Sequence, residues 1–468
     1  MRSKVKNFKV KNTGVLDEAN IELGDITLIF GRNNTGKTAL AYRFLDGIRD
    51  IRSYRPVKKN IDSKEHLGKL KAYLQNEDHK QIKLLLEERI KEKLNTKPHR
   101  ESKTSDHNYG VRLGSLEINL DLSLDTTKEL LLLYKNKKFM QALQSSVSLL
   151  LEGKNDLDIN PLDHLLYMLV ERVFACTNER NALAGWREEL RLHNEINSLL
   201  SDRGDLIRML KENGLDEDKA LSLLPKIRAS LGLESKRLDS DYESLILSRQ
   251  HIFNLDFKTK STLDKDGYAL RLLAKITGAP DYELDEGSLL FKPNDFKGEK
   301  STDGKINIKS ASGSTKSLML LDYYLRHRAR PGDLLVIDEP EMNLDPYNQI
   351  LLARLFVLLA KHKIQIVITT HSDFIVRELS NCIALNNLTI NQIKELQDYG
   401  EEYKLNSHKV KAYTMQKVED GRCVAKEVEV DARYGICAYI FDDAIEAQNR
   451  DQDRIFRRLP KDSGAQND

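Results

Sequence analysis

An eight-residue segment near the start of the chain restricts the possible folds more than any other feature. The segment from Gly31 to Thr38 reads GRNNTGKT and fits the pattern GxxxxGK[ST]. A compact apolar run, 26–30, precedes it, and apolar residues at helical spacing follow it to residue 52. A strand, a glycine-rich loop and a helix in this order direct successive backbone N–H groups at phosphate oxygens. The segment therefore predicts a phosphate-binding loop in an α/β fold.

Each part of this loop has an expected role in holding a nucleotide. Lys37 is expected to reach the β- and γ-phosphates, and the Thr38 hydroxyl to bind Mg²⁺. The glycines let the backbone approach the phosphates closely. The predicted nucleotide-binding residues are Gly31, Arg32, Asn33, Asn34, Thr35, Gly36, Lys37 and Thr38.

A second apolar run, 334–337, ends in the acid pair Asp338 and Glu339. Four apolar residues in a row are typical of a central strand of a parallel sheet, which is covered on both faces. Carboxylates at the end of such a strand lie where open α/β sheets bind ligands. We expect Asp338 to hold Mg²⁺ through water, and Glu339 to orient and polarise an attacking water.

A third stretch typical of a buried strand, 367–370, is followed by His371. A lone histidine at a strand end is more often structural than catalytic. Here one predicted helix, 346–363, and one strand separate it from the acid pair, so the spacing brings His371 to the same edge of the sheet. We therefore expect it to contact the γ-phosphate or the attacking water.

The fourth motif, SASGSTKS at 310–317, leads into a predicted helix over 318–326. Small hydroxyl residues and glycine before a helix can form a second anion site from N–H groups and the helix dipole. A capped helix start explains the same pattern equally well. The residues concerned are Ser310, Ser312, Gly313, Ser314 and Lys316.

Composition limits the remaining possibilities. The formal net charge is only +2, which makes no case for nucleic acid or membrane. No apolar run approaches the roughly 20 residues that span a bilayer, and the four cysteines form no CxxC pair. We expect a cytoplasmic protein with no membrane partner. Segment 52–103 has 15 Lys and Arg against 8 Asp and Glu, which indicates a solvated helix face, with DNA contact as the minority interpretation.

The pattern along the chain predicts an interrupted domain rather than a series of repeats. Between 126 and 254 it is mostly helical and broken by glycines, which argues against a long coiled coil. The predicted parts are an N-terminal lobe with the phosphate loop (1–55), a basic helical insertion and return to the lobe (56–125), a helical lid or arm (126–255), a C-terminal lobe (256–390), and a small C-terminal element with a tail (391–468).

Together these four motifs resemble the ABC ATPase superfamily. The stretch NLDP at 343–346 is similar to its D-loop, with Asp345 as the acidic residue, and 310–317 to a degenerate ABC signature. The resemblance implies an α/β fold, an ABC-type P-loop ATPase head with a mixed β-sheet and large α-helical insertions. It implies ATP and Mg²⁺ as ligands. It also implies a homo-oligomer, at least a dimer, in which each P-loop faces the signature of the other chain.

Within the superfamily, the chain resembles the branch of SMC, RecF and OLD ATPases, since the gap from Thr38 to Ser310 exceeds that of a transporter domain. Residues 174–181, FACTNERN, resemble the "PAERN"-like block of defence ATPases without its proline. Size and layout are similar to the ATPases of the PARIS and Septu anti-phage systems. This resemblance implies a sensor or scaffold controlling a separately encoded effector such as a nuclease, with a phage-encoded trigger.

Two alternatives stay open: a DNA-maintenance ATPase of the SMC or RecF kind, and a nuclease acting alone through a site in the insertions. A fused TOPRIM domain has little room in the 97 residues after His371. Asp451 and Asp453 fit DxD but lie in a helix-like tail, and alternating acids along one strand at 427, 429 and 431 indicate a solvated face. Arg187 with His193, and His107 with Asn108, are expected to be surface residues rather than nuclease sites.

Overall fold

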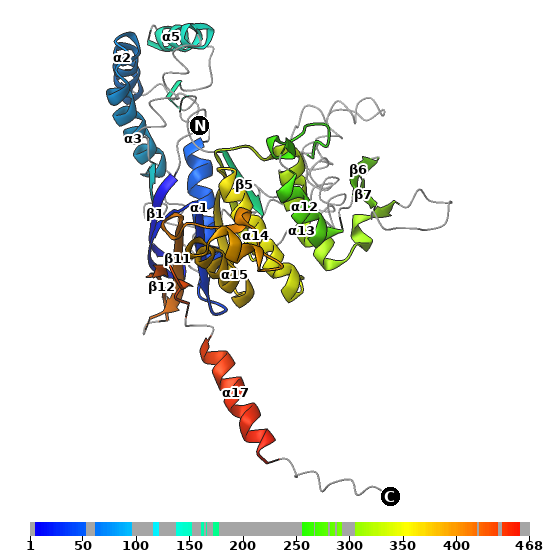
Figure 1. The fold of residues 1–468 in the computed structure, drawn as a ribbon. Coiled ribbons are helices and arrows are strands. Elements are labelled where there is room, and N and C mark those ends of the chain that lie inside the picture. Colours follow the sequence, from blue (N-terminus) through cyan, green and yellow to red (C-terminus); the bar gives the residue numbers. More distant parts are fainter. Residues whose placement is uncertain are drawn as a thin grey trace, which may run out of the picture.

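This computed structural model describes residues 5–52, 61–95, 116–120, 137–151, 161–162, 165, 172–176, 255–265, 267–278, 281–285, 288–292, 305–418, 421–438 and 442–458. Its centre is a nine-stranded sheet in the order β4-β1-β2-β12-β11-β3-β10-β9-β5 (Figure 1). The strands are β1 Val5–Thr13, β2 Leu16–Glu22, β3 Ile26–Gly31, β4 Leu116–Leu120, β5 Arg172–Cys176, β9 Asp333–Asp338, β10 Gln365–Thr370, β11 Val410–Lys417 and β12 Cys423–Val428.

Strand directions make this a mixed sheet. The five strands from β11 to β5 run parallel, whereas β1 pairs antiparallel with both β2 and β4. β12 is antiparallel to β11 and parallel to β2. Two smaller sheets are formed by β6 Asp281–Asp285, β7 Ser288–Lys292 and β8 Ile306–Asn307, and by β13 Val430–Asp431 and β14 Gly435–Ile436. The predicted α/β fold with a mixed sheet is confirmed.

Helices cover both faces of the sheet and bury a separate core on each. The described α-helices are α1 Lys37–Arg52, α2 Ile61–Gln75, α3 His79–Asn95, α5 Lys137–Leu151, α12 Tyr268–Thr277, α13 Gly313–Tyr323, α14 Pro346–Lys361, α15 Asp373–Ala384, α16 Ile390–Lys394 and α17 Asp442–Phe456. Helices α1, α2, α3 and α5 contribute to one core, and α12 to α15 to the other. Because strand side chains alternate, Leu28 and Phe30 of β3 enter the second core and Ile29 enters the first. All six residues of β3 are buried, which explains its continuous apolar sequence.

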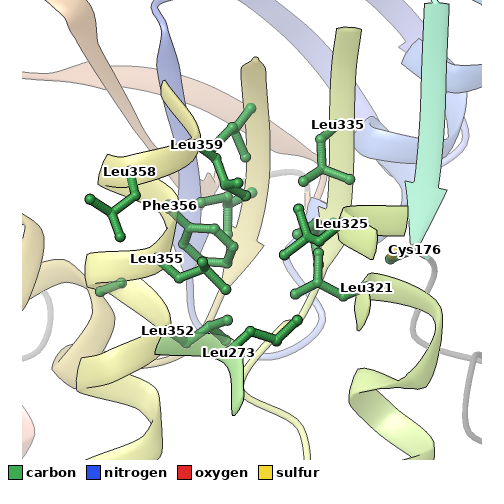
Figure 2. Packing of buried hydrophobic residues seen from close by; sticks show 14 of the residues in the cluster. Cys176, Leu273, Leu321, Leu325, Leu335, Leu352, Leu355, Phe356, Leu358 and Leu359 are labelled. Atoms are coloured by element: carbon green, nitrogen blue, oxygen red, sulfur yellow. The ribbon is translucent and has the colours of Figure 1, made fainter. Parts of the chain in front are cut away.

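Helix α14 is apolar along most of its length because it lies inside the second core. Figure 2 shows Leu355 and Phe356 of α14 on one side of this core, and Leu335 of β9, Leu325 and Leu321 on the other. Full burial of a leucine or phenylalanine side chain contributes roughly 1.5–3 kcal/mol. This packing fixes α14 rigidly, and with it the turn that precedes the helix at the edge of the sheet.

Two segments predicted to lie outside the ATPase lobes supply strands of the central sheet. Strand β5 falls within 126–255, and it is the edge strand next to β9. Strands β11 and β12 fall within 391–468, and β11 lies directly beside β3. Both pairings join residues far apart in sequence, so no local pattern signals them. The remainder of the predicted lid or arm lies mostly outside the described residues.

The acidic positions near the C-terminus differ from the sequence prediction. Glu427 belongs to β12 and Asp431 to β13, with Glu429 between them, so the prediction that the three alternate along one strand is wrong. The chain leaves the first strand at Val428 and begins a separate two-stranded sheet. Asp451 and Asp453 lie in α17, which extends away from the sheet in Figure 1 and confirms the predicted helix. Within the described ranges, no helix combines the length and the apolar character needed to cross a membrane.

A buried ion pair joins α14 to α15. Arg354 Nε donates to Glu378 Oε1 at 2.6 Å, and these side chains are only 10% and 4% exposed. The guanidinium carbon lies 4.3 Å from the centre of the Tyr399 ring, and the Tyr399 hydroxyl donates to Glu378 Oε2 at 2.9 Å. Arg354 also donates to the carbonyl of Asp398 at 2.8 Å. The pair therefore fastens the segment after α16 to the second core.

Replacing Arg354 with methionine is expected to lower the free energy of unfolding by about 3 kcal/mol, because Glu378 would stay buried without its counter-charge. The loss falls at the lower end of the usual range since Tyr399 still donates to the carboxylate. Urea denaturation followed by circular dichroism measures it. Arg377→Met, which removes an exposed ion pair on α15, is the control and should cost below about 1 kcal/mol. A similarly small loss for Arg354→Met would contradict the prediction.

Candidate functional site

The loop between β3 and α1 has the backbone of an anion cradle. Gly31 and Gly36 have φ values of +151° and +84°, and Asn34 has +58°. A Cβ at Gly31 would lie 2.8 Å from the carbonyl oxygen of Met415, and one at Gly36 would lie 2.9 Å from Leu16. Side chains at these two glycines would thus clash with β11 and β2, while Arg32, Asn33 and Asn34 are exposed. The loop closes tightly and presents its N–H groups at the start of α1.

Lys37 is buried inside the loop that would bind a phosphate. The residue is 3% exposed, and Nζ donates to the carbonyls of Gly31 at 3.1 Å and Arg32 at 2.9 Å. Thr35 Oγ1 donates to the same Arg32 carbonyl at 2.8 Å. Burial lowers the pKa of Lys37 below its ordinary value, while the nearby carboxylates, Glu339 first, oppose this shift. The ammonium group is therefore poorly solvated here and would gain from an anionic partner.

Thr38 and Asp338 meet at the carboxyl end of β9. Thr38 Oγ1 donates to Asp338 Oδ1 at 3.2 Å, and Thr369 Oγ1 of β10 donates to the same oxygen. Asp338 is only 2% exposed. One hydroxyl and one carboxylate are the oxygen donors that Mg²⁺ takes when it keeps several waters and binds phosphate. No group of three or more His, Cys, Asp or Glu side chains suited to a metal occurs in the described part of the chain. The donors fit Mg²⁺ held together with a phosphate better than a metal held by protein alone.

His371 bridges the phosphate loop and the acid pair. Its Nε2 lies 2.8 Å from Glu339 Oε1, and its Nδ1 lies 3.1 Å from the carbonyl oxygen of Gly31. Glu339 has an unusual φ of +48°, fixed by hydrogen bonds from its N–H to the carbonyl and the hydroxyl of Thr369. A carbonyl oxygen accepts hydrogen bonds and cannot donate them. The hydrogen bond between Nδ1 and the Gly31 carbonyl therefore requires a proton on Nδ1. A second proton is then shared between Nε2 and Glu339, either on the ring or on the carboxyl group. This arrangement can hold and move a proton beside the phosphate loop.

Glu341 is a partly exposed acid with a buried carboxylate oxygen, and the sequence motifs did not identify it. Its Oε1 accepts the N–H of His371 at 2.6 Å and the Thr370 hydroxyl at 2.9 Å. Its Oε2 is buried with no hydrogen-bond partner among the described residues. Burial raises the pKa of this carboxyl, and the hydrogen bonds, that of His371 first, offset part of the rise. The only sequence signal is an acid two positions after Glu339, which by itself does not distinguish a buried residue from an exposed one.

The serine-rich stretch forms a capped helix start. Ser312 is the N-cap of α13, and its Oγ accepts the N–H of Thr315 at 3.1 Å. The same Oγ lies 2.9 Å from the hydroxyl oxygens of Ser314 and Thr315. Ser310, Ser312 and Gly313 are exposed, and Ser314 and Lys316 are partly so. The predicted capping is observed, and it leaves these hydroxyl groups at the surface.

The turn before α14 carries Asp345. The aspartate caps this helix by accepting the N–H groups of Tyr347 at 3.0 Å and Asn348 at 3.1 Å. Asn343 has a φ of +63°, and its side chain lies against Gly313, at 3.1 Å from an added Cβ there. The serine-rich stretch therefore contacts this turn. The phosphate loop, the acid pair and His371 are instead joined to one another directly by hydrogen bonds.

Several predicted features lie in β5 or outside the described residues, and not in this site. Residues 174–176 of the block that resembles "PAERN" lie in β5, and 177–181 fall outside the described residues. The pairs Arg187 with His193 and His107 with Asn108 also fall outside them. The topology, together with the meeting of the phosphate loop, acid strand and His371, confirms the predicted ABC-type P-loop fold.

A family model and several solved structures resemble this chain. A protein-family model described as "AAA domain, putative AbiEii toxin, Type IV TA system" matches residues 26–377. No curated protein matches the sequence. Among solved structures, the SMC head domain of Pyrococcus furiosus bound to the C-terminal domain of ScpA is 12% identical, with a TM-score of 0.35, covering 96% of this chain and 100% of that one. The SMC head domain of Thermotoga maritima is 10% identical, with a TM-score of 0.31, covering 92% and 100%. Both TM-scores are too low to support any inference about this chain.

Proposed function

The chain belongs to the AAA-domain family whose model spans residues 26–377, and from this membership we propose that it binds ATP with Mg²⁺ and hydrolyses it to ADP and phosphate. The observation that carries the proposal is the 2.8 Å contact between His371 Nε2 and Glu339 Oε1, beside the loop that closes on Lys37. A nucleotide-binding module without hydrolysis has no need of an acid and a histidine that share a proton at this position.

In this proposal some residues of the site bind the nucleotide, and others act in the hydrolysis step. The N–H groups from Gly31 to Thr38 and the Lys37 ammonium bind the phosphates. Thr38 and Asp338 hold Mg²⁺, which when bound neutralises charge on the phosphate oxygens. Glu339 orients a water molecule and accepts its proton, and His371 holds Glu339 in place through Nε2. The low exposure of Asp338 and Lys37 keeps bulk water away from both charges.

We further propose that two copies of the chain complete one another's sites. In this arrangement Ser310, Ser312, Gly313, Ser314 and Lys316 of one copy face the nucleotide of the other, and Asp345 lies at the shared surface. The exposure of Ser312 and Gly313 at the start of α13 supports this role, because a helix N-terminus attracts anions. ATP hydrolysis should accordingly rise more steeply than linearly with protein concentration.

The proposed biological role is that of a sensor or scaffold in an anti-phage system, controlling a separate effector. The family description names a toxin–antitoxin system, which supports a defence role. Affinity purification with the neighbouring genes co-expressed tests this role. A stoichiometric nuclease-like partner supports it. Recovery of DNA without a protein partner would favour DNA maintenance, and cleavage of RNA or DNA by the purified chain alone would favour a nuclease.

The proposed ATPase activity should depend entirely on Mg²⁺. Phosphate release by the purified protein is expected to fall to background when EDTA removes the metal, and to return when Mg²⁺ is added. Asp338→Asn should raise the Mg²⁺ concentration needed for half-maximal release by about tenfold, since one carboxylate charge is lost.

Asp333→Asn is the matched control, because Asp333 lies at the opposite end of the same strand and contacts Tyr324 and Arg330 instead. Its Mg²⁺ requirement should equal that of the wild type. Absence of Mg²⁺-dependent phosphate release from wild-type protein, tested up to high protein concentration, would overturn the proposed activity.

A further inference from the structure

The turn that carries His371 is held from two sides by side chains of the neighbouring turn and helix. This His371 turn, residues 370–372, joins β10 to α15. On one side, Glu341 accepts the His371 N–H and the Thr370 hydroxyl, as described above. On the other side lies Gln349, in the first turns of α14. The position of the His371 ring therefore depends on residues that belong to neither the phosphate loop nor the acid pair.

Gln349 joins two turns through both ends of its amide. Its Oε1 accepts the hydroxyl of Ser372 at 2.6 Å, and its Nε2 donates to the carbonyl of Leu344 at 2.8 Å. The two hydrogen bonds assign the amide orientation, because a hydroxyl can donate to Oε1 whereas a carbonyl can only accept from Nε2. Leu344 lies in the turn between Asn343 and Asp345. One side chain thus spans the turn before α14 and the His371 turn.

Ser372, which donates to Gln349, is the residue directly after His371 and connects the two. It is only 6% exposed, and its Oγ accepts the N–H of Ile375 at 3.1 Å, which makes it the N-cap of α15. Its own N–H donates to Thr370 Oγ1 at 2.9 Å. Both neighbours of His371 are therefore hydrogen-bonded, which restrains the backbone that holds the ring beside Glu339.

We propose that Gln349 is a positioning residue for the reaction, which fixes His371 against Glu339 by holding Ser372 to the turn before α14. This inference rests on the proposed ATP hydrolysis. Gln349 contacts neither Lys37, Thr38 nor Asp338 in any hydrogen bond described above, so it acts on the chemical step and not on nucleotide binding. Because the Leu344 turn also carries Asn343 against Gly313, the same side chain links the serine-rich stretch to the histidine.

The test replaces Gln349 with methionine, which has similar size and no hydrogen-bonding amide. The expected result is a loss of about 10-fold in kcat with the Kd for ATP unchanged within about twofold, since small misplacement of catalytic groups lowers the rate and not the binding. In a His371→Ala background, Gln349→Met should lower kcat by less than about twofold, because residues acting as one unit are not additive. An unchanged kcat for Gln349→Met, or an undiminished loss in the His371→Ala background, overturns the proposal.

Serine variants of α15 provide a matched pair. Ser372→Ala removes the partner of Gln349 and should reproduce the loss in kcat. Ser380→Ala removes hydrogen bonds of the same helix, to the Val376 carbonyl and from the Ile436 N–H, and should leave kcat unchanged. Equal losses from the two variants would mean that α15 is simply destabilised, and would overturn the proposal.

Hydrogen exchange of the nucleotide-free protein separates this inference from the proposed activity. The peptide containing the His371 turn should exchange about 10-fold faster in Gln349→Met than in the wild type, with the central strands unchanged. If wild-type protein releases no phosphate, the proposed ATPase activity fails, and the proposed effect of Gln349 on kcat fails with it, whatever the exchange result. If wild-type protein is active but exchange at the turn is unchanged in Gln349→Met, only the positioning role fails.

Discussion

Lys37→Ala is expected to weaken ATP binding by about 10- to 150-fold. A hydrogen bond to a charged group in a protein contributes about 1.5–3 kcal/mol, and Lys37 is the cation buried inside the phosphate loop. Its ammonium group is poorly solvated in the free protein, so little hydration is lost when a phosphate arrives. Isothermal titration calorimetry with Mg²⁺ and ATP, on protein unable to hydrolyse it, measures the effect. A change in Kd below about threefold would contradict this role of Lys37.

The same substitution should leave the fold intact, which makes the binding result interpretable. The Gly31 carbonyl keeps the His371 ring as a donor, and the Arg32 carbonyl keeps the Thr35 hydroxyl, so neither loses its last partner. Because burial lowers the pKa of Lys37 below 10.5, its charge costs stability in full at a pH below the folded-state pKa. That cost falls as the pH rises from the folded-state pKa towards 10.5, above which it is lost. At neutral pH, urea denaturation should find Lys37→Ala at least as stable as the wild type. Lys411→Ala changes a partly exposed lysine of β11 that pairs with Glu22, and it is the control for affinity.

Glu339→Gln is expected to lower kcat by about 1,000-fold while ATP binding is retained. An amide keeps the shape of the side chain and can still accept from His371 Nε2, but it cannot take a proton from water. Loss of a general base typically costs 100- to 10,000-fold in rate. Single-turnover phosphate release gives the rate, and filter binding of labelled ATP gives the affinity.

The variant should also accumulate as an ATP-bound dimer, which size-exclusion chromatography with light scattering detects. Glu402→Gln changes an acid of the short turn Glu401–Tyr403, outside the hydrogen-bonded residues of the site, and should behave as wild type. A Glu339→Gln protein that hydrolyses ATP within about fivefold of the wild-type rate would remove Glu339 from the proposed mechanism.

Much of the site could be predicted because its motifs are local. Three buried strands, each ending in polar residues, were sufficient to expect Lys37, Asp338 and His371 at one edge of the sheet. The parallel pairing of β3, β10 and β9 brings them there. Apolar runs predict such strands directly, because the side chains on both faces of the strand are buried.

The residues that hold the site in shape could not be predicted in this way. Glu341 and Gln349 owe their roles to hydrogen bonds across a tertiary contact, and each looks like an ordinary surface residue in sequence. Strand β5 lies in a region that reads as helical, because five residues beside β9 weigh little against a long helical pattern. Strand β11 pairs with β3 across most of the chain, and no local propensity encodes that choice.

The place of β11 beside β3 has a consequence for how the protein is made. The Tyr413 hydroxyl of β11 accepts the N–H of Glu22 across 391 residues of sequence. During synthesis, β3 leaves the ribosome early. Both of its edges stay unpaired until β10 follows, and one edge stays unpaired until β11 follows. Long-range pairing of this kind folds slowly and leaves an open strand edge that other chains can join. Nascent chains should therefore depend on chaperones until translation passes residue 417, and the phosphate loop becomes functional only at that late point.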